Sequence, residues 1–537
     1  MEAFNIAIDV LIGTPAILAA FAGVAYGIIG GAMPGISPSV AMALLVPFTF
    51  TMDPTTAIIM LASVYVGAEY GGSIPAILIN TPGTNAAAAT TIDGYALHQQ
   101  GRGGEALGIS LMAGVVGGLV GVIVLVALTG PLAKIALLFT PAAYFSLGIL
   151  SLSVIASLTE GSLVKGLIMG VLGLMVATIG SDPISGVTRF TFGFPELFGG
   201  IHFVLVMMGV FAVSELLKQI GERDEEQVER DSRIRLPKLK DWKRLWFPVS
   251  LGSALGTFEG ITPGGGGAVA SFLSYNEARR WSKHPEEFGK GSIEGIAAPE
   301  AANNTVAGTA LIPTLSFGIP GSNSTAVLLG ALLVHGMQPG PMLFAQNPKV
   351  MYGLYGGLFV ANIAQLVIGL LIMTPCIWLV NRPKRYRLAA IYALVLSGVY
   401  SIDSSVLDLI VVLMAGVFGY VMKRLKFPML PLVLGLMLGY MVESNFRRAL
   451  LISSDDPMTF LQDKISLTLL ILSGLMIFGS AIWPACSGLL ASLTPPPLPR
   501  PPAWIWALIT HQSELYSSLS FLAAATASAS VSATIPS

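Results

Sequence analysis

Charged residues are scarce in this chain. Asp, Glu, Lys and Arg make up only 11% of its 537 residues, whereas hydrophobic residues make up 54%. A soluble protein carries about 25% charged residues, so the composition argues against a water-soluble protein with one large apolar core. Uninterrupted apolar runs such as 109–128 and 357–380 reach the roughly 20 residues that a membrane-spanning helix needs. The sequence therefore predicts an all-α polytopic membrane protein embedded in a lipid bilayer.

Cysteines, net charge and an N-terminal basic flank are also lacking. The two cysteines, Cys376 and Cys486, lie in apolar segments, so neither a disulfide framework nor a thiolate metal site follows from them. The net charge of −1 gives no sign of nucleic-acid binding. The first ten residues contain no Lys or Arg. They therefore lack the basic flank of a cleaved secretory signal, and we expect them to belong to the mature fold.

Enzyme signatures are missing as well. The sequence has no HExxH, GxSxG or Walker A motif. The stretch FGKGS (288–292) contains Gly-Lys but lacks the upstream glycine and the following Ser or Thr of a phosphate-binding loop. We therefore expect no enzymatic activity, no catalytic residues, no resident cofactor and no metal beyond a transported ion such as Na⁺.

The sequence does contain one motif that occurs twice in similar form. IPAILINTPGTN (74–85) returns as IPTLSFGIPGSN (312–323), and each copy follows an earlier Pro-Gly within GGAMPGISPSV (30–40) or EGITPGGGGAV (259–269). Each half of the chain thus interrupts its apolar segments twice, in the same order. The four breaks are Pro34-Gly35, Pro82-Gly83, Pro263-Gly264 and Pro320-Gly321.

The distribution of basic residues predicts how the halves are oriented. The polar segment 218–244 carries nine Lys or Arg, which places it in the cytoplasm by the positive-inside tendency. The segment 246–281 has basic residues at both ends, so both ends are expected to be cytoplasmic, with Pro-Gly between them. The corresponding stretch of the first half has no Lys or Arg, since Arg102 is the first in the chain, and it is flanked by Glu2, Asp9 and Asp53.

These flanks favour two re-entrant helical hairpins that enter the membrane from opposite faces, as inverted repeats do. Each repeat is expected to hold one such hairpin and one broken transmembrane helix. The alternative is that each hairpin is two ordinary short helices joined by a Pro-Gly turn on the far face. Four spans would follow the loop at Arg102, at 105–128, 135–157, 163–181 and 199–218. The predicted organisation is a first membrane repeat (1–217), a cytoplasmic charged loop (218–245), a second membrane repeat (246–490) and a Pro-rich and Ala/Ser-rich tail (491–537).

The breaks offer binding groups. Helix N-termini attract anions, and carbonyls freed just before a break coordinate cations. Thr84 and Asn85, and Ser322 to Thr325, follow the second breaks and suit helix capping. The alternative is that Pro and Gly only kink these helices for packing. The candidate substrate- and ion-binding residues are Pro34, Gly35, Ser37, Pro82, Gly83, Thr84, Asn85, Pro263, Gly264, Gly265, Glu300, Asn303, Asn304, Pro320, Gly321, Ser322, Asn323, Ser324 and Thr325.

Carboxylates in apolar segments are costly and therefore informative. Glu69 and Glu300 are two of them, and Glu300 with Asn303 and Asn304 can line one helix face toward a cavity. Its alternative role is an interhelical hydrogen-bond pair. We expect Asp93 to form an interfacial ion pair with the basic residues His98 and Arg102 near it.

Taken together, these motifs resemble the large membrane subunit of the tripartite tricarboxylate transporters, the TctA family. The resemblance covers about residues 10–490. It is carried by YGGSIPAILINTPG (70–83), DGYALHQQGRGGEALG (93–108), PGGGGAVASFL to APEAANN (263–304), and IPTLSFGIPGSN to PMLF (312–344). The proline-rich segment near 495–502 and the Ala/Ser-rich end depart from it.

The resemblance implies cation-coupled import of di- or tricarboxylates across the bacterial inner membrane. The implied partners are a small membrane subunit and a periplasmic solute-binding protein that delivers the carboxylate. A passive anion channel is the alternative function from another class. The sequence does not separate Na⁺ from H⁺ as the coupling ion, and it does not name the carboxylate.

Overall fold

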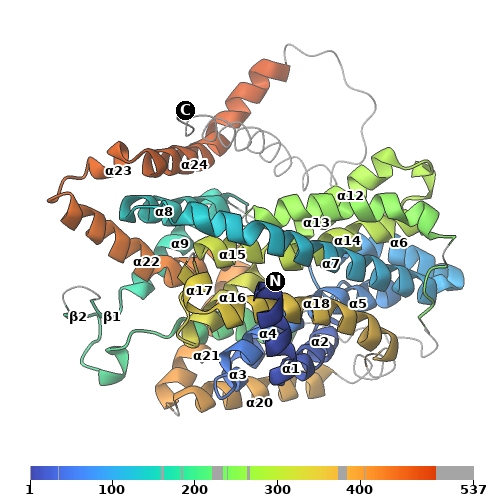
Figure 1. The fold of residues 1–537 in the computed structure, drawn as a ribbon, viewed down its shortest axis with the longest axis horizontal. Helices are drawn as coiled ribbons and strands as arrows, with labels where there is room; N and C mark the ends of the chain where they lie inside the picture. Colours follow the sequence, from blue (N-terminus) through green and yellow to red (C-terminus); the bar gives the residue numbers. More distant parts are fainter. Residues whose placement is uncertain are drawn as a thin grey trace.

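A computed structural model describes residues 2–33, 36–158, 162–182, 186–220, 234–238, 240–262, 266–340, 342–372, 376, 384–403 and 405–491. Within these residues the protein is almost entirely helical (Figure 1). The described part contains a single two-stranded antiparallel sheet, β1 (Gly180–Ser181) with β2 (Thr188–Arg189), in which Gly180 pairs with Arg189. The tail predicted at 491–537 lies outside the described residues, apart from its first residue.

The first half of the chain forms helices that match the predicted order of interruptions. They are α1 (Glu2–Gly13), α2 (Ala16–Gly31), α3 (Pro38–Thr49), α4 (Pro54–Gly71), α5 (Ser73–Ile79), α6 (Ala87–Leu97), η1 (His98–Arg102), α7 (Gly103–Ala136), α8 (Pro141–Leu158), α9 (Leu163–Ala177), η2 (Pro195–Leu197), α10 (Phe203–Met207), η3 (Met208–Val213) and α11 (Ser214–Ile220).

The second half repeats much of this order. Its helices are α12 (Trp242–Ile261), α13 (Gly266–Trp281), η4 (Pro285–Glu287), α14 (Ile293–Thr309), α15 (Leu311–Phe317), α16 (Asn323–Val334), α17 (Met342–Gln346), α18 (Pro348–Leu371), α20 (Lys384–Asp403), α21 (Val406–Arg424), α22 (Leu430–Ile452), α23 (Thr459–Gln462) and α24 (Lys464–Ala491).

Several of these segments are long and apolar enough to cross a bilayer. Within the described residues, five helical segments qualify by length and composition, and a sixth is possible if α1 and α2, bent by 78°, count as one span. The five are Pro54–Ile79, Ala87–Ala136, Phe203–Ile220, Pro348–Leu371 and Val406–Arg424. This bears out the prediction of a polytopic α-helical membrane protein.

The 50-residue segment Ala87–Ala136 is not one straight rod. Gly101 has a positive φ of 77° inside η1, a conformation that glycine adopts without steric cost. The chain reverses there, so that α6 and α7 pack against each other (Figure 1). The predicted span 105–128 lies inside α7, whereas α8 begins at Pro141, later than the predicted 135.

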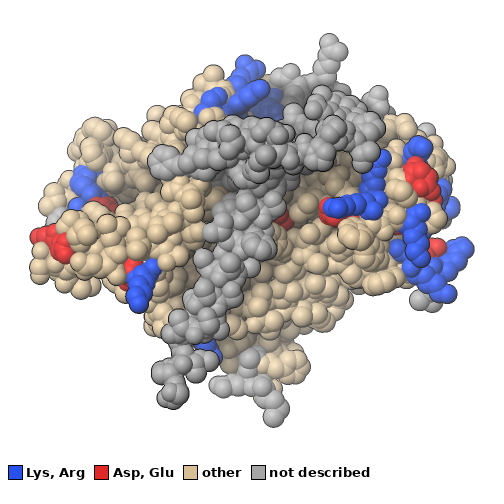
Figure 2. Space-filling model, turned by 90° about the horizontal axis from the view of Figure 1, so that it is seen from above, with Lys and Arg blue, Asp and Glu red and all other residues tan. Residues whose placement is uncertain are grey.

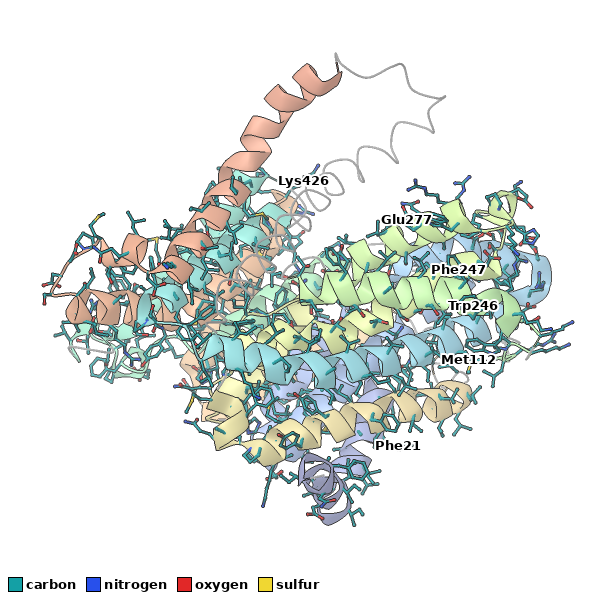
Figure 3. The ribbon with its side chains drawn as sticks, turned by 45° about the horizontal axis from the view of Figure 1, so that its top comes forward. Phe21, Met112, Trp246, Phe247, Glu277 and Lys426 are labelled. Carbon is teal, nitrogen blue, oxygen red and sulfur yellow. The ribbon has the colours of Figure 1, made fainter. Side chains whose placement is uncertain are left out.

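The outer surface fits a lipid environment. On the face shown in Figure 2, most charged side chains gather toward the ends of the long axis and at the upper edge, with broad uncharged areas between them. In Figure 3, α7, α12, α13 and α18 run alongside one another, and Trp246 and Phe247 belong to the outer part of α12. Trp246 is 60% exposed. Such apolar surface is stable against acyl chains and unstable against water.

Corresponding helices of the two halves pack in corresponding ways. α2 packs along α4 and against α3, as α12 packs along α14 and against α13. α7 packs along α14, and α18 packs along α4. α3 has 12 residues and α13 has 16, which at 1.5 Å per residue is about 18 and 24 Å. Both are shorter than the roughly 30 Å hydrocarbon layer.

Candidate functional site

The helices before Pro82-Gly83 and Pro320-Gly321, α5 and α15, end in the same way. α5 stops at Asn80, which has φ 55°, and α15 stops at Gly318, which has φ 74°. A left-handed residue at this position is a common helix terminator and is usually Gly, sometimes Asn. The repeated motif therefore has the same local structural effect in both copies, because each copy ends a helix at a left-handed residue, exposed at Asn80 and buried at Gly318.

Hydroxyl side chains accept hydrogen bonds at the start of both helices that follow these breaks, but only α16 has the predicted N-cap residue, because the N-cap of α6 is Ala86 and not Thr84 or Asn85. Thr84 Oγ1 accepts a hydrogen bond from Ala87 N at 3.2 Å. Ser322 and Thr325 form a reciprocal capping box, with Thr325 N donating to Ser322 Oγ at 3.2 Å and Ser322 N donating to Thr325 Oγ1 at 2.8 Å. Asn85 and Asn323 are exposed, whereas Ser324 is buried. The two asparagines thus face an accessible surface beside the new helix ends.

Within the first half, the two breaks lie side by side. The amide of Gly83 donates to the carbonyl of Gly72 at 2.9 Å. A Cβ on Gly83 would lie 2.8 Å from Gly72 Cα and would collide with the carbonyl oxygen of Gly31. Gly31 ends α2 just before Pro34 and Gly35, which lie outside the described residues. Beyond them Ser37 caps α3 by accepting from Val40 N at 3.3 Å.

The second half shows the same neighbourhood. A Cβ on Gly260, at the end of α12, would collide with Thr309 Oγ1 and lie 3.1 Å from Ala310 N. A Cβ on Gly321 would lie 2.8 Å from Ala310 O. Pro320 is buried between these elements. Pro263, Gly264 and Gly265 lie outside the described residues.

Contacts between the halves bring all of these regions together. A Cβ on Gly267, at the start of α13, would lie 3.2 Å from Ala86 Cβ and would collide with Asn303 Oδ1. Tyr65 Oη, on α4, lies 3.2 Å from Ser322 Oγ. α3 packs against α16 just as α6 packs against α13. The described flanks of the four breaks therefore lie close to one another, with some of their residues buried and others exposed. Pro82 flanks the same region and is half-buried.

A buried carboxylate lies next to the first of these junctions. Glu300 is 1% exposed. Its Oε1 accepts from Ser73 Oγ and from Thr90 Oγ1, both at 2.5 Å. Ser73 begins α5 and Thr90 is in α6, so the two donors stand on opposite sides of the break at 80–86. Glu300 Oε2 has no hydrogen-bond partner. The predicted interhelical hydrogen bonds are thus present, and one carboxylate oxygen stays free.

Other polar side chains extend this buried group along α14. Glu69 on α4 lies against the Asn303 side chain, neither of whose polar atoms has a hydrogen-bond partner. Asn304 Nδ2 donates to the Glu300 carbonyl at 3.0 Å. Gln365 on α18 donates to Asn304 Oδ1 at 3.4 Å. The break motifs themselves contain no Lys or Arg.

Sequence reasoning missed one carboxylate. Glu259, near the end of α12, is 1% exposed, and neither of its oxygens has a hydrogen-bond partner. The available signal was an acidic residue four positions before Pro263, at the apolar end of α12.

Asp93 corrects another expectation. It does not pair with His98 or Arg102; Arg102 instead pairs with Glu105 at 2.6 Å. Asp93 is completely buried. Its Oδ1 accepts from the amides of Gly289, Gly291 and Ser292 at 2.8 Å each, and its Oδ2 accepts from Tyr275 Oη at 2.9 Å. The carboxylate therefore ties α6 of the first half to the loop and hairpin of the second half.

A second polar clamp holds the same end of α14. Arg244 donates from Nε to Glu294 Oε1 and from Nη2 to Glu287 Oε2, both at 2.5 Å. The Glu294 side chain is only 8% exposed, whereas that of Arg244 is 31% exposed. The charged loop before α12 also contacts the first half, because Arg235 N donates to Gly104 O at 2.7 Å.

Replacing Arg244 should therefore leave the buried carboxylate of Glu294 without its positively charged partner. We expect Arg244→Ala to cost about 2–3 kcal/mol, below the usual value for a fully buried pair because Arg244 is partly hydrated. Thermal unfolding in detergent measures the change. The double variant Arg244→Ala/Glu294→Gln should recover much of the loss. Arg280→Ala, whose side chain is 72% exposed, should stay within about 0.5 kcal/mol of the wild type. Equal stability of Arg244→Ala and the wild type would contradict the clamp.

Comparison with known proteins assigns a family to this arrangement. The sequence model of the family described as "Tripartite tricarboxylate transporter TctA family" matches residues 17–434. A protein of Agrobacterium vitis, named "Uncharacterized 52.8 kDa protein in TAR-I ttuC' 3'region", is 40% identical over 452 residues, which is 84% of this chain and 90% of that protein. A second protein of that organism, from the "TAR-II ttuC' 3'region", is 36% identical over 215 residues, or 40% of this chain and 89% of that protein. No solved structure matches.

Proposed function

Because the chain belongs to the tripartite tricarboxylate transporter TctA family, we propose that it is the large permease subunit of a secondary transporter that imports di- or tricarboxylates across the bacterial inner membrane. It works with a small membrane subunit and a periplasmic binding protein. The coupling ion is Na⁺ or H⁺. Residues 1–217 and 246–490 form two inverted repeats, joined by the cytoplasmic loop 218–245.

The reciprocal packing of the halves supports inverted repeats. α3 of the first half packs against α16 of the second, and α13 of the second half packs against α6 of the first. Each short hairpin thus lies beside the broken helix of the other repeat. A two-fold axis in the membrane plane relates such pairs and brings their interruptions to the midplane.

The observation that carries the transport proposal is that the break flanks of both halves lie close to one another and that the break motifs contain no Lys or Arg. Unpaired backbone groups cost several kcal/mol in hydrocarbon, so interrupted helices persist only when they are buried in protein or line a wet cavity. Amides at the start of α6 and α16, with the exposed Asn85 and Asn323 beside them, suit a carboxylate ligand. Each hydrogen bond to a charged group contributes about 1.5–3 kcal/mol.

Electrostatics supports coupling to a cation. Moving one net negative charge inward against an inside-negative potential costs about 2.3 kcal/mol per 100 mV. A dicarboxylate therefore needs cations that travel with it. Glu69 and Glu300 are buried acidic groups beside the breaks, and a buried carboxylate needs a cation or a proton to offset its charge.

Gradient dependence separates this function from the passive anion channel. Proteoliposomes that contain both membrane subunits, supplied with the binding protein and radiolabelled citrate or a dicarboxylate, should accumulate substrate above the external concentration. Collapsing the Na⁺ and H⁺ gradients separately should abolish accumulation in one case. Equilibration that ignores both gradients would instead indicate a channel.

The asparagines at the restarted helices provide a direct test of the substrate site. We expect Asn85→Leu or Asn323→Leu to lower uptake at least tenfold, since an apolar side chain replaces polar groups that face the ligand, and each lost hydrogen bond to a charge is worth about tenfold. Protein yield should stay normal because both side chains are exposed. Asn347→Leu, beyond the breaks at the start of α18, is the control. Wild-type uptake by both variants would remove the proposed site.

A further inference from the structure

We propose that Glu300, Ser73, Thr90 and Ser110 form a binding site for the coupling cation, and that this cation is Na⁺. The inference rests on the proposed transport function and names the ion and its ligands. All four side chains are buried, and Glu300 is 1% exposed. They come from α14, α5, α6 and α7, so the site exists only when these elements are assembled.

The first argument is the arrangement of oxygen atoms. Ser73 and Thr90 donate to one carboxylate oxygen, Oε1, at 2.5 Å. Ser110 Oγ lies beside the same carboxylate without a hydrogen-bond partner. Glu300 Oε2 is also without a partner. Carboxylate and hydroxyl oxygens are hard ligands that suit ions such as Na⁺, and the lone pairs of all three hydroxyls remain available to such an ion.

The second argument concerns charge. A carboxylate inside the membrane without a counter-charge is strongly unfavourable. The side chains that donate hydrogen bonds to Glu300 Oε1 are the hydroxyls of Ser73 and Thr90, which are neutral. One carboxylate among neutral hydroxyls balances a monovalent cation. Another buried acidic group that interacts electrostatically with Glu300 is Glu69 on α4, which lies against Asn303. No group of three His, Cys, Asp or Glu ligands in the described residues includes Glu300, which argues against a transition-metal site.

The third argument concerns the ionised form of Glu300, which Na⁺ binding requires. Hydrogen bonds donated to an ionised carboxylate stabilise the ionised form. Two hydroxyls already donate to Oε1 of Glu300. Burial acts in the opposite direction and favours the protonated acid, so a cation at the free Oε2 would supply the charge that keeps the carboxylate ionised.

The position of the site explains how the ion acts on the substrate. Ser73 precedes the break at 80–86 and Thr90 follows it. An ion held by both hydroxyls fixes α5 relative to α6. Ala86, just before α6, lies against Gly267 of the opposite hairpin. Bound Na⁺ therefore orders the start of α6, which faces the carboxylate of the substrate, so that substrate and ion bind cooperatively.

Ion binding is tested on the purified protein with Na⁺ alone as the probe. The melting temperature is measured while Na⁺ replaces K⁺ at constant ionic strength. A bound ion stabilises the folded state in proportion to the logarithm of its concentration above Kd, so the wild type should show a Na⁺-specific rise that stays small below Kd and is logarithmic above it. Glu300→Gln should abolish the rise. Thr90→Val and Ser110→Ala should weaken the apparent Na⁺ affinity at least tenfold. Thr90→Ser, which keeps the hydroxyl, should bind Na⁺ with an affinity close to that of the wild type.

Controls make the result specific. Glu259→Gln neutralises another fully buried carboxylate, and it should keep the wild-type response to Na⁺. If Glu300→Gln does not fold, the two hydroxyl variants carry the test. A wild-type protein without a Na⁺-specific rise, or equal responses in wild type, Thr90→Val and Ser110→Ala, would overturn the proposal.

The same reconstituted system separates this proposal from the proposed function. Uptake that follows the H⁺ gradient without any need for Na⁺ would overturn the Na⁺ site and leave transport intact. The absence of uptake under every gradient, with the binding protein present, would overturn the transport function itself. Na⁺-driven uptake that Thr90→Val shifts to at least tenfold higher Na⁺ concentrations would support both.

Discussion

Gly83→Ala should yield a protein that hardly folds and hardly transports. The added methyl group would lie 2.8 Å from Gly72 Cα and would collide with Gly31 O. Both neighbours are backbone atoms of packed helices, so neither can move like a flexible side chain. Overpacking of this kind costs about 1–3 kcal/mol, and more where backbones meet. We expect a cost of about 3 kcal/mol, and uptake per cell at least tenfold below wild type.

The measurement combines yield of monodisperse protein in detergent, melting temperature and uptake per milligram. Gly130→Ala is the matched control, since a Cβ at Gly130 has no atom within 4 Å and alanine favours the helix. It should match or slightly exceed wild-type stability. If Gly83→Ala behaves like Gly130→Ala, Gly83 does not pack against Gly31 at the end of α2 and Gly72 before α5 as described.

The sequence predicted the fold class and the order of interruptions because these depend on local chemistry. Composition indicates membrane helices, and Pro-Gly followed by Thr or Ser indicates a helix that stops and restarts. The hydrogen bonds that Thr84 and Ser322 accept at these helix starts follow from this pattern. The left-handed end of α5 at Asn80 is also a local property, because Asn is one of the few residues that tolerates it.

Tertiary partners were beyond local reasoning. Ser73 lies 227 residues from Glu300, and Gly291 lies 198 residues from Asp93. Helical spacing placed Glu300 and Asn303 on one face, but it gave no means to choose the hydroxyls that meet them. For Asp93 the nearest basic residues in sequence were the natural candidates. Asp93 instead binds the backbone amides of the 289–292 loop, because a buried carboxylate gains several charge-assisted hydrogen bonds there without desolvating a cation.

Asp93, bound to the amides of the 289–292 loop and to Tyr275, forms a latch between the two halves. The second strong prediction is that Asp93→Ala opens this latch. The substitution removes the acceptor for three amides and for Tyr275 Oη. Hydrogen bonds to a charged group contribute about 1.5–3 kcal/mol each, but such losses do not add fully when the freed groups find water. We expect a loss on the order of 4 kcal/mol and amide exchange in 289–292 at least a hundredfold faster.

Intermediate variants identify the carboxylate as the cause. Asp93→Asn keeps Oδ1 as an acceptor but loses the charge, so it should lie between wild type and Asp93→Ala. Tyr275→Phe removes one bond and should cost about 1 kcal/mol. Asp9→Asn, at an exposed position of α1, controls for the loss of an acidic group. Hydrogen exchange by mass spectrometry reports on 289–292 directly, and wild-type protection of these amides in Asp93→Ala would refute the latch. Accelerated exchange together with lost uptake would show that α6 and the second hairpin must stay joined during transport. The reason is that the start of α6, proposed to face the substrate, directly follows the break at 80–86.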